Sequence, residues 1–232
     1  MKDKTTWILV GLLVIASFLA GTFWTRLRSL EEGKEVAEEA TKQEETGSVE
    51  TLKADDHLRG GQEARILLIE YSDLECPFCG RFHSTAQQAV DNFDGQVAWV
   101  YRHFPLDQLH SKARKEAEAT ECAAEIGGNE GFWKMTDKIY EVTPGNNGLD
   151  LGTLPDLAEQ VGLDRAEFAE CLESGRQAQS VEEDFQSGLR AGIKGTPGVF
   201  LFDTQTGETR SVPGAVPFEQ LKPEIESLLQ AG

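Results

Sequence analysis

The chain has 232 residues, long enough for one sizeable hydrophobic core but too short for two ordinary domains and a membrane anchor. It carries 40 Asp and Glu residues against 22 Lys and Arg, a formal net charge of −18. Such a surface repels phosphate backbones, so a nucleic-acid partner is not expected. The four cysteines are too few for a disulfide-scaffold miniprotein. They form one close and one distant pair, which indicates two different roles.

A membrane anchor is predicted near the start of the chain, after a short tail of residues 1–6. Residues 7–24 are an uncharged apolar run with a tryptophan at each end. At helical rise this run spans about 27 Å, close to the hydrocarbon thickness of a bilayer. A cleaved signal peptide is the alternative, but Phe18 stands two residues before Ala20, where cleavage requires a small side chain. We therefore predict one uncleaved transmembrane helix.

Residues 25–60 are predicted to form an acidic stalk or linker. Glu, Lys, Ala and Thr dominate this segment, and such a composition buries too little apolar surface to fold alone. Its few apolar residues are too sparse for the seam of a coiled coil. Because no dimerisation device is evident, we expect a monomer.

The remaining residues, 61–232, are predicted to form one α/β domain. Residues 66–69 are a continuous apolar run, typical of a strand that is buried on both faces. Pro77 begins a helical stretch that reaches about Asn92, and residues 97–101 form a second strand. This β–α–β order implies parallel strands joined by a right-handed crossover.

A helical block and a hairpin complete the domain. Helices are predicted over residues 111–126, 131–142, 154–161, 165–173 and 177–191. Strands over 198–203 and 209–212 then form a hairpin, and an amphipathic helix over 218–229 follows. The order βαβ, helical block, ββα is that of a thioredoxin-like core with an all-helical insertion at about 107–192, although fold alone does not give function.

The close cysteine pair, Cys76-Pro77-Phe78-Cys79, stands where the first strand passes into the first helix. A cysteine at a helix N-terminus faces unpaired N–H groups and the positive end of the helix dipole, which favour the thiolate. Proline in the first helical turn removes no helical hydrogen bond. The motif therefore predicts a redox pair, in which Cys76 is the attacking, more exposed sulfur and Cys79 resolves the mixed disulfide.

The alternative for this pair is half of a zinc site, with His83 as a third ligand. Structural zinc takes four ligands, usually from a second close pair. Cys122 and Cys171 lie 49 positions apart inside predicted helices, so no second close pair exists. Redox chemistry is favoured over zinc. We expect no metal and no cofactor beyond the redox-active disulfide itself.

Two other positions are candidates for the same site. Glu70 ends the first buried strand, where a desolvated carboxyl could relay the proton of Cys79, unless it simply points to water. Thr196-Pro197 stands just before the third strand. A plain trans turn is the alternative there, but a cis-proline would let Thr196 offer backbone groups to an extended peptide.

Several stretches resemble DsbA-like thioredoxin domains, and the resemblance runs from about Ala54 to the C-terminus. They are IEYSDLECPFC at 69–79, YRHFPL at 101–106, GFW at 131–133 and GTP at 195–197. The resemblance implies Cys76 as nucleophile, Cys79 as resolving thiol, Glu70 as the buried acid and Pro197 as a cis-proline. It also implies a substrate-binding surface made by Thr196, Pro197, Pro77 and Phe78.

The dipeptide between the cysteines departs from that of the strongly oxidising members, which carry Pro-His. Phe78 adds no positive charge to the thiolate, and Asp73 and Glu75 nearby would oppose it. We therefore expect a less oxidising pair than in those members. Thr196 before the proline also resembles the isomerase and reductase branches, which leaves the direction of electron flow open.

The distant cysteine pair is interpreted through the same resemblance, because similar domains often join these helices. A Cys122–Cys171 disulfide would close a loop of 171 − 122 + 1 = 50 residues, worth up to about 4 kcal/mol in the chain-entropy model. Two buried free thiols are the alternative.

Together these features predict an extracytoplasmic thiol–disulfide oxidoreductase, held in a bacterial cytoplasmic membrane by a single span at 7–24. Its partners would be exported cysteine-containing proteins and a membrane redox partner or small thiol that resets the cysteine pair. We favour an oxidase, because isomerases commonly work as dimers and no dimerisation seam is present. An isomerase or reductase of the same fold, and a non-catalytic anchored binding or chaperone module, are the alternatives.

Overall fold

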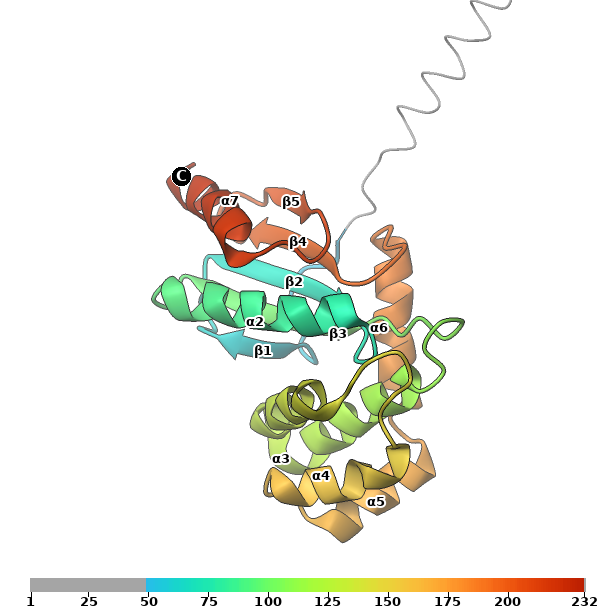
Figure 1. The fold of residues 1–232 in the computed structure, drawn as a ribbon. Helices are drawn as coiled ribbons and strands as arrows, with labels where there is room; N and C mark the ends of the chain where they lie inside the picture. The colour runs from blue at the N-terminus through green and yellow to red at the C-terminus, as the bar shows by residue number, and fades with distance from the viewer. Residues whose placement is uncertain (1–48, 232) are drawn as a thin grey trace, which may run out of the picture. The chain divides into compact units, whose positions relative to one another are not determined.

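The computed structural model describes residues 49–231. The predicted tail, anchor and most of the stalk lie outside these residues, and within them no helix is both long and apolar enough to span a bilayer. A five-stranded mixed sheet, in the order β1-β3-β2-β4-β5, forms the centre of the domain (Figure 1). Its strands are β1 (His57–Gly60), β2 (Ile66–Ser72), β3 (Val97–His103), β4 (Gly198–Asp203) and β5 (Thr209–Val212).

The helices of the domain are α2 (Pro77–Asn92), α3 (Ala113–Val142), the short 3-10 turn η1 (Leu151–Thr153), α4 (Leu154–Gln160), α5 (Arg165–Ser174), α6 (Ala178–Arg190) and α7 (Phe218–Gln230). Three of them cover the two faces of the sheet. Helices α2 and α7 lie against one face, and the end of α6 lies against the other. Helices α3, α4 and α5 form a separate lobe with its own apolar core (Figure 1). The predicted order βαβ, helical block, ββα is confirmed.

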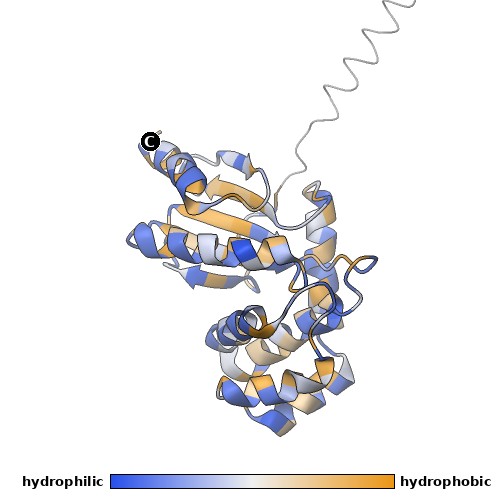
Figure 2. Cartoon of the chain, in the orientation of Figure 1, coloured by the Kyte–Doolittle hydropathy of each residue, from blue (hydrophilic) through white to orange (hydrophobic). Residues whose placement is uncertain are grey.

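The central strand β2 explains how the sequence positions the two layers. Every residue of β2 is buried, and side chains alternate between its faces. Ile66 and Leu68 point toward α2 and α7, whereas Leu67 and Ile69 point toward the α6 side. Figure 2 shows this strand as a hydrophobic band between more polar helices. By the same alternation, Glu70 faces the layer that contains α2.

The folded domain begins earlier than predicted, because residues 49–60, assigned to the stalk, are part of it. β1 pairs antiparallel with β3, with His57 opposite Tyr101. The buried Arg102 donates hydrogen bonds to the Asp56 carboxylate at 2.8 Å and to the carbonyl oxygen of Glu50 at 2.9 Å. The predicted boundary at residue 61 is therefore wrong. The segment is held by an arginine of a distant strand, which its own polar composition does not show.

Helix α3 contains both of the first two predicted insertion helices. They meet at Gly128, whose backbone has φ 63° and ψ −161° and is not helical. Just after this kink, a Cβ on Gly131 would clash with the Ala123 carbonyl oxygen, so the close approach of the two segments requires glycine. The break in the sequence pattern is therefore a kink within one long element.

The distant cysteines are joined in a disulfide within the helical lobe. Cys122 on α3 and Cys171 on α5 are bonded, with their Cα atoms 5.8 Å apart. Both side chains are fully buried in the core of the lobe, beside Phe168 and Met135. The crosslink thus joins α3 to α5 within the insertion and leaves Cys76 and Cys79 as the free thiols of the described chain.

Removing this crosslink is expected to weaken the domain without touching the cysteine pair. The double variant Cys122→Ala/Cys171→Ala should lower the free energy of unfolding by roughly 2–4 kcal/mol, because its unfolded chain is no longer constrained by a closed loop. Urea denaturation followed by circular dichroism measures this difference. The thiol chemistry of Cys76 should persist in the folded variant. An unfolding free energy equal to that of the wild type would contradict the expectation.

Candidate active site

The close cysteine pair lies where β2 leads into α2. Cys76 is the N-cap of α2, with extended backbone angles, and Pro77 is the first helical residue. Cys76 is 6% exposed and Cys79 is fully buried, while Phe78 between them is 55% exposed. A reacting partner can therefore approach Cys76 past Phe78, but it cannot reach Cys79 directly.

The Thr196–Pro197 segment lies against Cys76 although it is 120 positions away in the chain. The peptide bond between Thr196 and Pro197 is cis. The Cys76 sulfur lies 3.5 Å from the Thr196 carbonyl oxygen, to which the thiol donates when it is protonated. Sheet topology produces this contact, because β4 pairs antiparallel with β2 and places Gly198 opposite Tyr71 near the start of α2.

The two sulfurs have opposite acid–base character. The Cys79 thiol hydrogen-bonds to the Cys76 sulfur and, with backbone N–H groups of the first helical turn, lowers the pKa of Cys76 to about 5. Burial, followed by that same hydrogen bond, raises the pKa of Cys79 well above its ordinary value. At neutral pH Cys76 is therefore a thiolate and Cys79 a thiol.

This difference predicts the pH dependence of alkylation in the reduced protein. Only the thiolate reacts, so iodoacetamide modification of Cys76 should become half-maximal near pH 5 rather than near pH 9. Rates measured between pH 3 and 9, with the modified residue identified by mass spectrometry, test this. In Cys79→Ala the midpoint should move to higher pH, because the thiol donor is lost. A wild-type midpoint above pH 8 would contradict the assignment.

A buried carboxyl lies under the pair. Glu70 on β2 is 1% exposed, so the alternative of a glutamate that points to water is excluded. Burial raises the pKa of Glu70 to about 8, while a hydrogen bond from Ser72 at 2.7 Å opposes that rise. Its charge in turn contributes to the raised pKa of Cys79. This carboxyl can therefore exchange a proton near neutral pH.

A chain of hydroxyl groups links this carboxyl to the helical lobe. The Ser72 hydroxyl, bonded to Glu70, lies 3.0 Å from the Tyr140 hydroxyl on α3. Tyr140 lies 3.2 Å from the Tyr101 hydroxyl on β3. The sequence analysis did not identify Ser72 or Tyr140. Their only sequence signal was weak, since a tyrosine on an insertion helix is ordinarily a core residue.

Comparison with known proteins places this geometry in a family. The family model Thioredoxin_4, described as thioredoxin, matches residues 52–215. The crystal structure of Pseudomonas aeruginosa DsbA2 is 33% identical, with a TM-score of 0.67 over 77% of this chain and 97% of that chain. The chain belongs to the DsbA family of thiol–disulfide oxidoreductases, within the thioredoxins. Oxidised BdbD from Bacillus subtilis, 23% identical with a TM-score of 0.64, covers 75% of this chain and 93% of its own, and has the same fold.

Curated relatives are larger proteins. Na(+)/H(+) antiporter NhaA 3 of Salinispora tropica is 34% identical over 150 residues, which is 63% of this chain and 21% of that protein. Na(+)/H(+) antiporter NhaA 1 of Salinispora arenicola is 33% identical over the same shares. The chain thus spans about a fifth of the length of these relatives.

In this DsbA-like domain, the acids just before Cys76 are turned into the protein. Asp73 accepts the Glu75 N–H at 2.8 Å and contacts the His110 ring at 2.9 Å. Glu75, fully buried, accepts the Leu149 N–H at 3.3 Å. Neither acid is among the largest causes of the lowered pKa of Cys76. The charge argument for a less oxidising pair therefore loses its support from these two residues.

A second buried carboxyl that the sequence analysis missed lies beside Glu75. Glu116 on α3 is fully buried, and burial together with the neighbouring Glu75 raises the pKa of Glu116 to about 10. It is therefore protonated at neutral pH, and the pair carries a single negative charge. Glu116 stands among the buried alanines Ala113, Ala117 and Ala119 of α3, which was the available signal.

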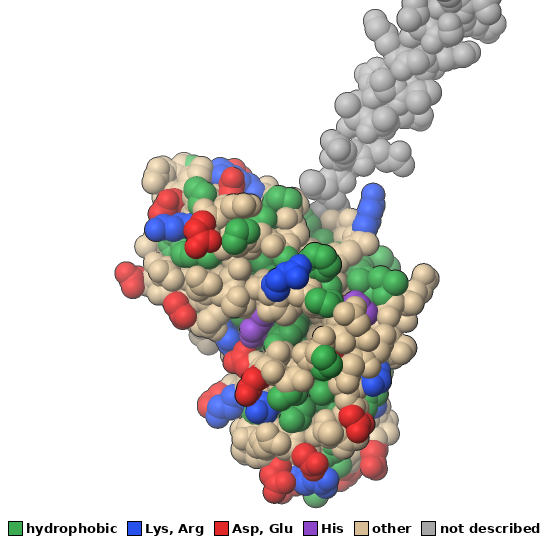
Figure 3. Space-filling model, viewed as in Figure 1, with side chains coloured by type: hydrophobic (Ala, Val, Ile, Leu, Met, Phe, Trp, Pro, Cys, Tyr) green, Lys and Arg blue, Asp and Glu red, His purple; other side chains and the backbone are tan. Residues whose placement is uncertain are grey.

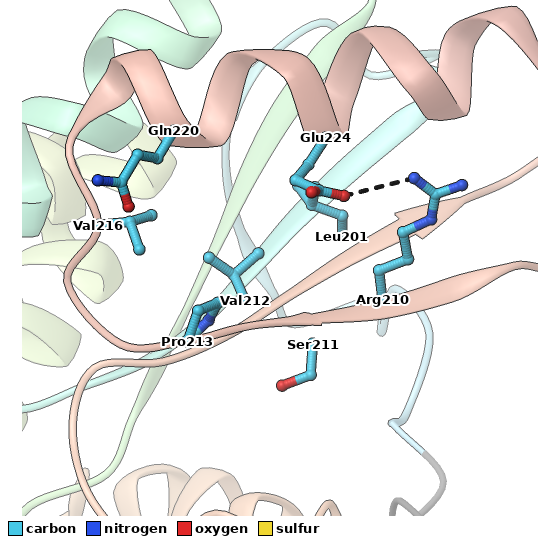
Figure 4. Close-up of a pocket in the computed structure, with 8 residues that line it drawn as sticks. All are labelled: Leu201, Arg210, Ser211, Val212, Pro213, Val216, Gln220 and Glu224. Atoms are coloured by element: carbon cyan, nitrogen blue, oxygen red, sulfur yellow. Dashed lines mark hydrogen bonds and ion pairs between the residues drawn. The ribbon is translucent and has the colours of Figure 1, made fainter.

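Other features of the DsbA-like domain lie apart from the cysteines. His83 binds Asp137 at 2.8 Å, and the described residues contain no cluster of three or more potential metal ligands. A pocket of about 530 Å³ lies between β5 and α7, with Arg210 and Glu224 3.5 Å apart beside it (Figure 4). Its lining includes neither cysteine and no residue of the cis-proline segment.

Proposed function

We propose that this protein is a membrane-anchored thiol–disulfide oxidase that introduces disulfides into exported, cysteine-containing proteins. One observation supports it above the others: a low-pKa sulfur at a helix N-terminus touches the carbonyl of the residue before a cis-proline. This arrangement provides a reactive sulfur and, beside it, a backbone acceptor for an extended client segment.

The chemistry proceeds by two exchanges from the oxidised Cys76–Cys79 pair. A client thiolate attacks the Cys76 sulfur, the intramolecular bond breaks, and Cys79 leaves as a thiolate that takes a proton from Glu70. A second client thiolate then attacks the client sulfur of the mixed disulfide, and Cys76 leaves. Two client thiols have lost two electrons and become a disulfide, and the cysteine pair has gained those electrons. A membrane redox partner or a small disulfide would remove them.

The low pKa of Cys76 favours the oxidase direction. A sulfur that is stable as a thiolate is a good leaving group, and stabilising the reduced form makes the disulfide a stronger oxidant. A reductase or isomerase instead requires a less stable reduced pair, which readily attacks client disulfides. The test is to incubate the oxidised full-length protein with a reduced two-cysteine peptide, and separately to equilibrate it with glutathione buffers.

Formation of one peptide disulfide per oxidised protein, together with an oxidising reduction potential in the glutathione buffers, would support the oxidase. Reduction of a peptide disulfide by the reduced protein, with a strongly reducing equilibrium, would indicate a reductase. Reshuffling of scrambled disulfides without net oxidation would indicate an isomerase. No exchange at all, with retained peptide binding, would indicate the binding module.

We also propose that the domain is extracytoplasmic and is tethered by residues 7–24, with residues 1–6 inside. The buried Cys122–Cys171 disulfide supports an oxidising compartment. The curated relatives are antiporters, which are membrane proteins by definition, so a similar domain belongs to membrane proteins elsewhere. Labelling of Cys76 in intact spheroplasts by a membrane-impermeant maleimide tests the orientation. Labelling only after lysis would place the domain inside.

A further inference from the structure

The basic side chains of the acidic domain are almost all paired, with two exceptions beside the active site. Arg65, for example, binds Asp203 at 2.9 Å, and Arg114 binds Asp107 at 2.8 Å. Within residues 49–231, only Arg81 and Lys194 among the lysines and arginines have neither an ion pair nor a side-chain hydrogen bond. Both side chains are exposed.

Arg81 lies beside Phe78, the exposed residue between the two cysteines. It lies in the second turn of α2, and its guanidinium carbon stands 4.5 Å from the centre of the exposed Phe78 ring. A cation over an aromatic face is held in place while its N–H groups stay open to a ligand. No acidic residue occupies the first turn of α2 to compete for it.

Lys194 is the second unpaired cation, and it lies in the segment that leads into the cis-proline. It precedes by two positions Thr196, whose carbonyl contacts Cys76. It also lines an apolar pocket of about 460 Å³, together with Phe185, Leu109 and Leu189. Figure 3 shows one Lys or Arg group beside hydrophobic side chains in the middle of this face, whereas most acidic groups lie toward its margins.

We propose that Arg81 with Phe78, and Lys194, form a binding surface for acidic peptide segments that flank a client cysteine. This inference rests on the proposed function and adds a substrate class to it. The two open cations are the complementary charges for Asp or Glu in a segment laid along the Thr196 carbonyl. The net charge of −18 repels such clients at long range, but physiological salt screens charges beyond about 8 Å. The contacts that a client makes beside Cys76 therefore determine which clients are preferred.

The test uses three peptides, each with one cysteine flanked on both sides by Glu, Gln or Lys. Mixed-disulfide formation with the oxidised full-length protein is timed by stopped flow and quenched mass spectrometry. Each rate is divided by the rate of the same peptide with the uncharged 2-hydroxyethyl disulfide, which removes differences in peptide thiol pKa. The normalised rate should be about two- to fivefold higher for Glu than for Gln per ion pair made, and lowest for Lys.

Variants separate the two cations from the overall charge. Arg81→Gln/Lys194→Gln should bring the Glu-to-Gln ratio to one, and 0.5 M salt should compress it in the wild type. The matched control Lys134→Gln/Lys222→Gln also removes two positive charges, one from α3 and one from α7, and should keep the wild-type ratio. Equal wild-type rates, or a preference for the Lys peptide, would overturn this inference alone. No reaction with any peptide would overturn the proposed function as well.

Discussion

Replacing Cys79 with serine should stop turnover and leave client proteins covalently attached to Cys76. Cys79 is fully buried beneath Cys76, so it is the only sulfur placed to break a mixed disulfide from inside the protein. Without Cys79, Cys76 can still attack a client that carries a disulfide, because Cys76 remains at the helix N-terminus beside Thr196. Resolution then depends on an external thiol, and turnover should fall to the rate of uncatalysed exchange.

The measurement is non-reducing electrophoresis of the tagged Cys79→Ser chain after acid trapping in cells. High-mass bands that collapse on reduction are the expected result. Cys76→Ser is the matched control and should show no such bands, since the attacking sulfur is gone. Cys122→Ala/Cys171→Ala should retain wild-type turnover. If Cys79→Ser captured no client while Cys76 was demonstrably reduced, the binding module would replace the enzyme as the best account.

The elements that the sequence predicted well are those with a local physical signature. Three local features determine their own structure and lie where they were predicted: the buried run at Ile66–Ile69, the proline at the start of α2 and the turn between β4 and β5. The CPFC motif likewise specifies its own environment, because a helix N-terminus acts on Cys76 whatever surrounds it.

What the sequence did not predict depends on contacts between distant segments. β1 pairs with β3, and Arg102 of β3 binds the polar segment just before β1, but nothing within that segment indicates either partner. Asp73 and Glu75 were expected to oppose the thiolate because they are close in sequence. Backbone amides bind both carboxylates, and the buried Glu116 of α3 lies beside Glu75, so the surroundings of these acids depend on a distant helix. The closeness of two residues in the sequence does not show in which direction their side chains extend in the folded protein.

Replacing the buried acid Glu70 with glutamine should also have a large effect on the reaction rate. Glu70→Gln should slow the steps in which Cys79 gains or loses its proton. Glutamine neither accepts nor releases a proton, so the internal exchange step should fall by about 10²- to 10⁴-fold. Glutamine has nearly the same shape as glutamate, and Ser72 can still donate a hydrogen bond to the oxygen of its side chain. The attack of a client on Cys76 should change much less, since Thr196 and the helix N-terminus govern that step.

The pH profile distinguishes this role from a merely structural one. Attack by Cys79 on a mixed disulfide needs the Glu70 carboxylate, so the wild-type rate should rise with pH and level off above about 8. Glu70→Gln should lose that inflection. Ser72→Ala should move it to higher pH, because the Ser72 hydrogen bond lowers the pKa of Glu70. Single-turnover rates between pH 6 and 9.5, with the mixed disulfide preformed, provide the measurement.

Stability should change in the opposite sense to activity. The folded pKa of Glu70, about 8, lies above its ordinary value, so its favourable contribution is complete below about pH 4.5 and is lost as pH rises toward 8. Glu70→Gln avoids burying that charge. Its free energy of unfolding should exceed that of the wild type by roughly 2–4 kcal/mol near pH 8 and match it near pH 4. A variant that is more stable yet slower would show that the buried acid is kept for proton transfer. One that is less stable at both pH values and keeps the inflection would assign Glu70 a structural role.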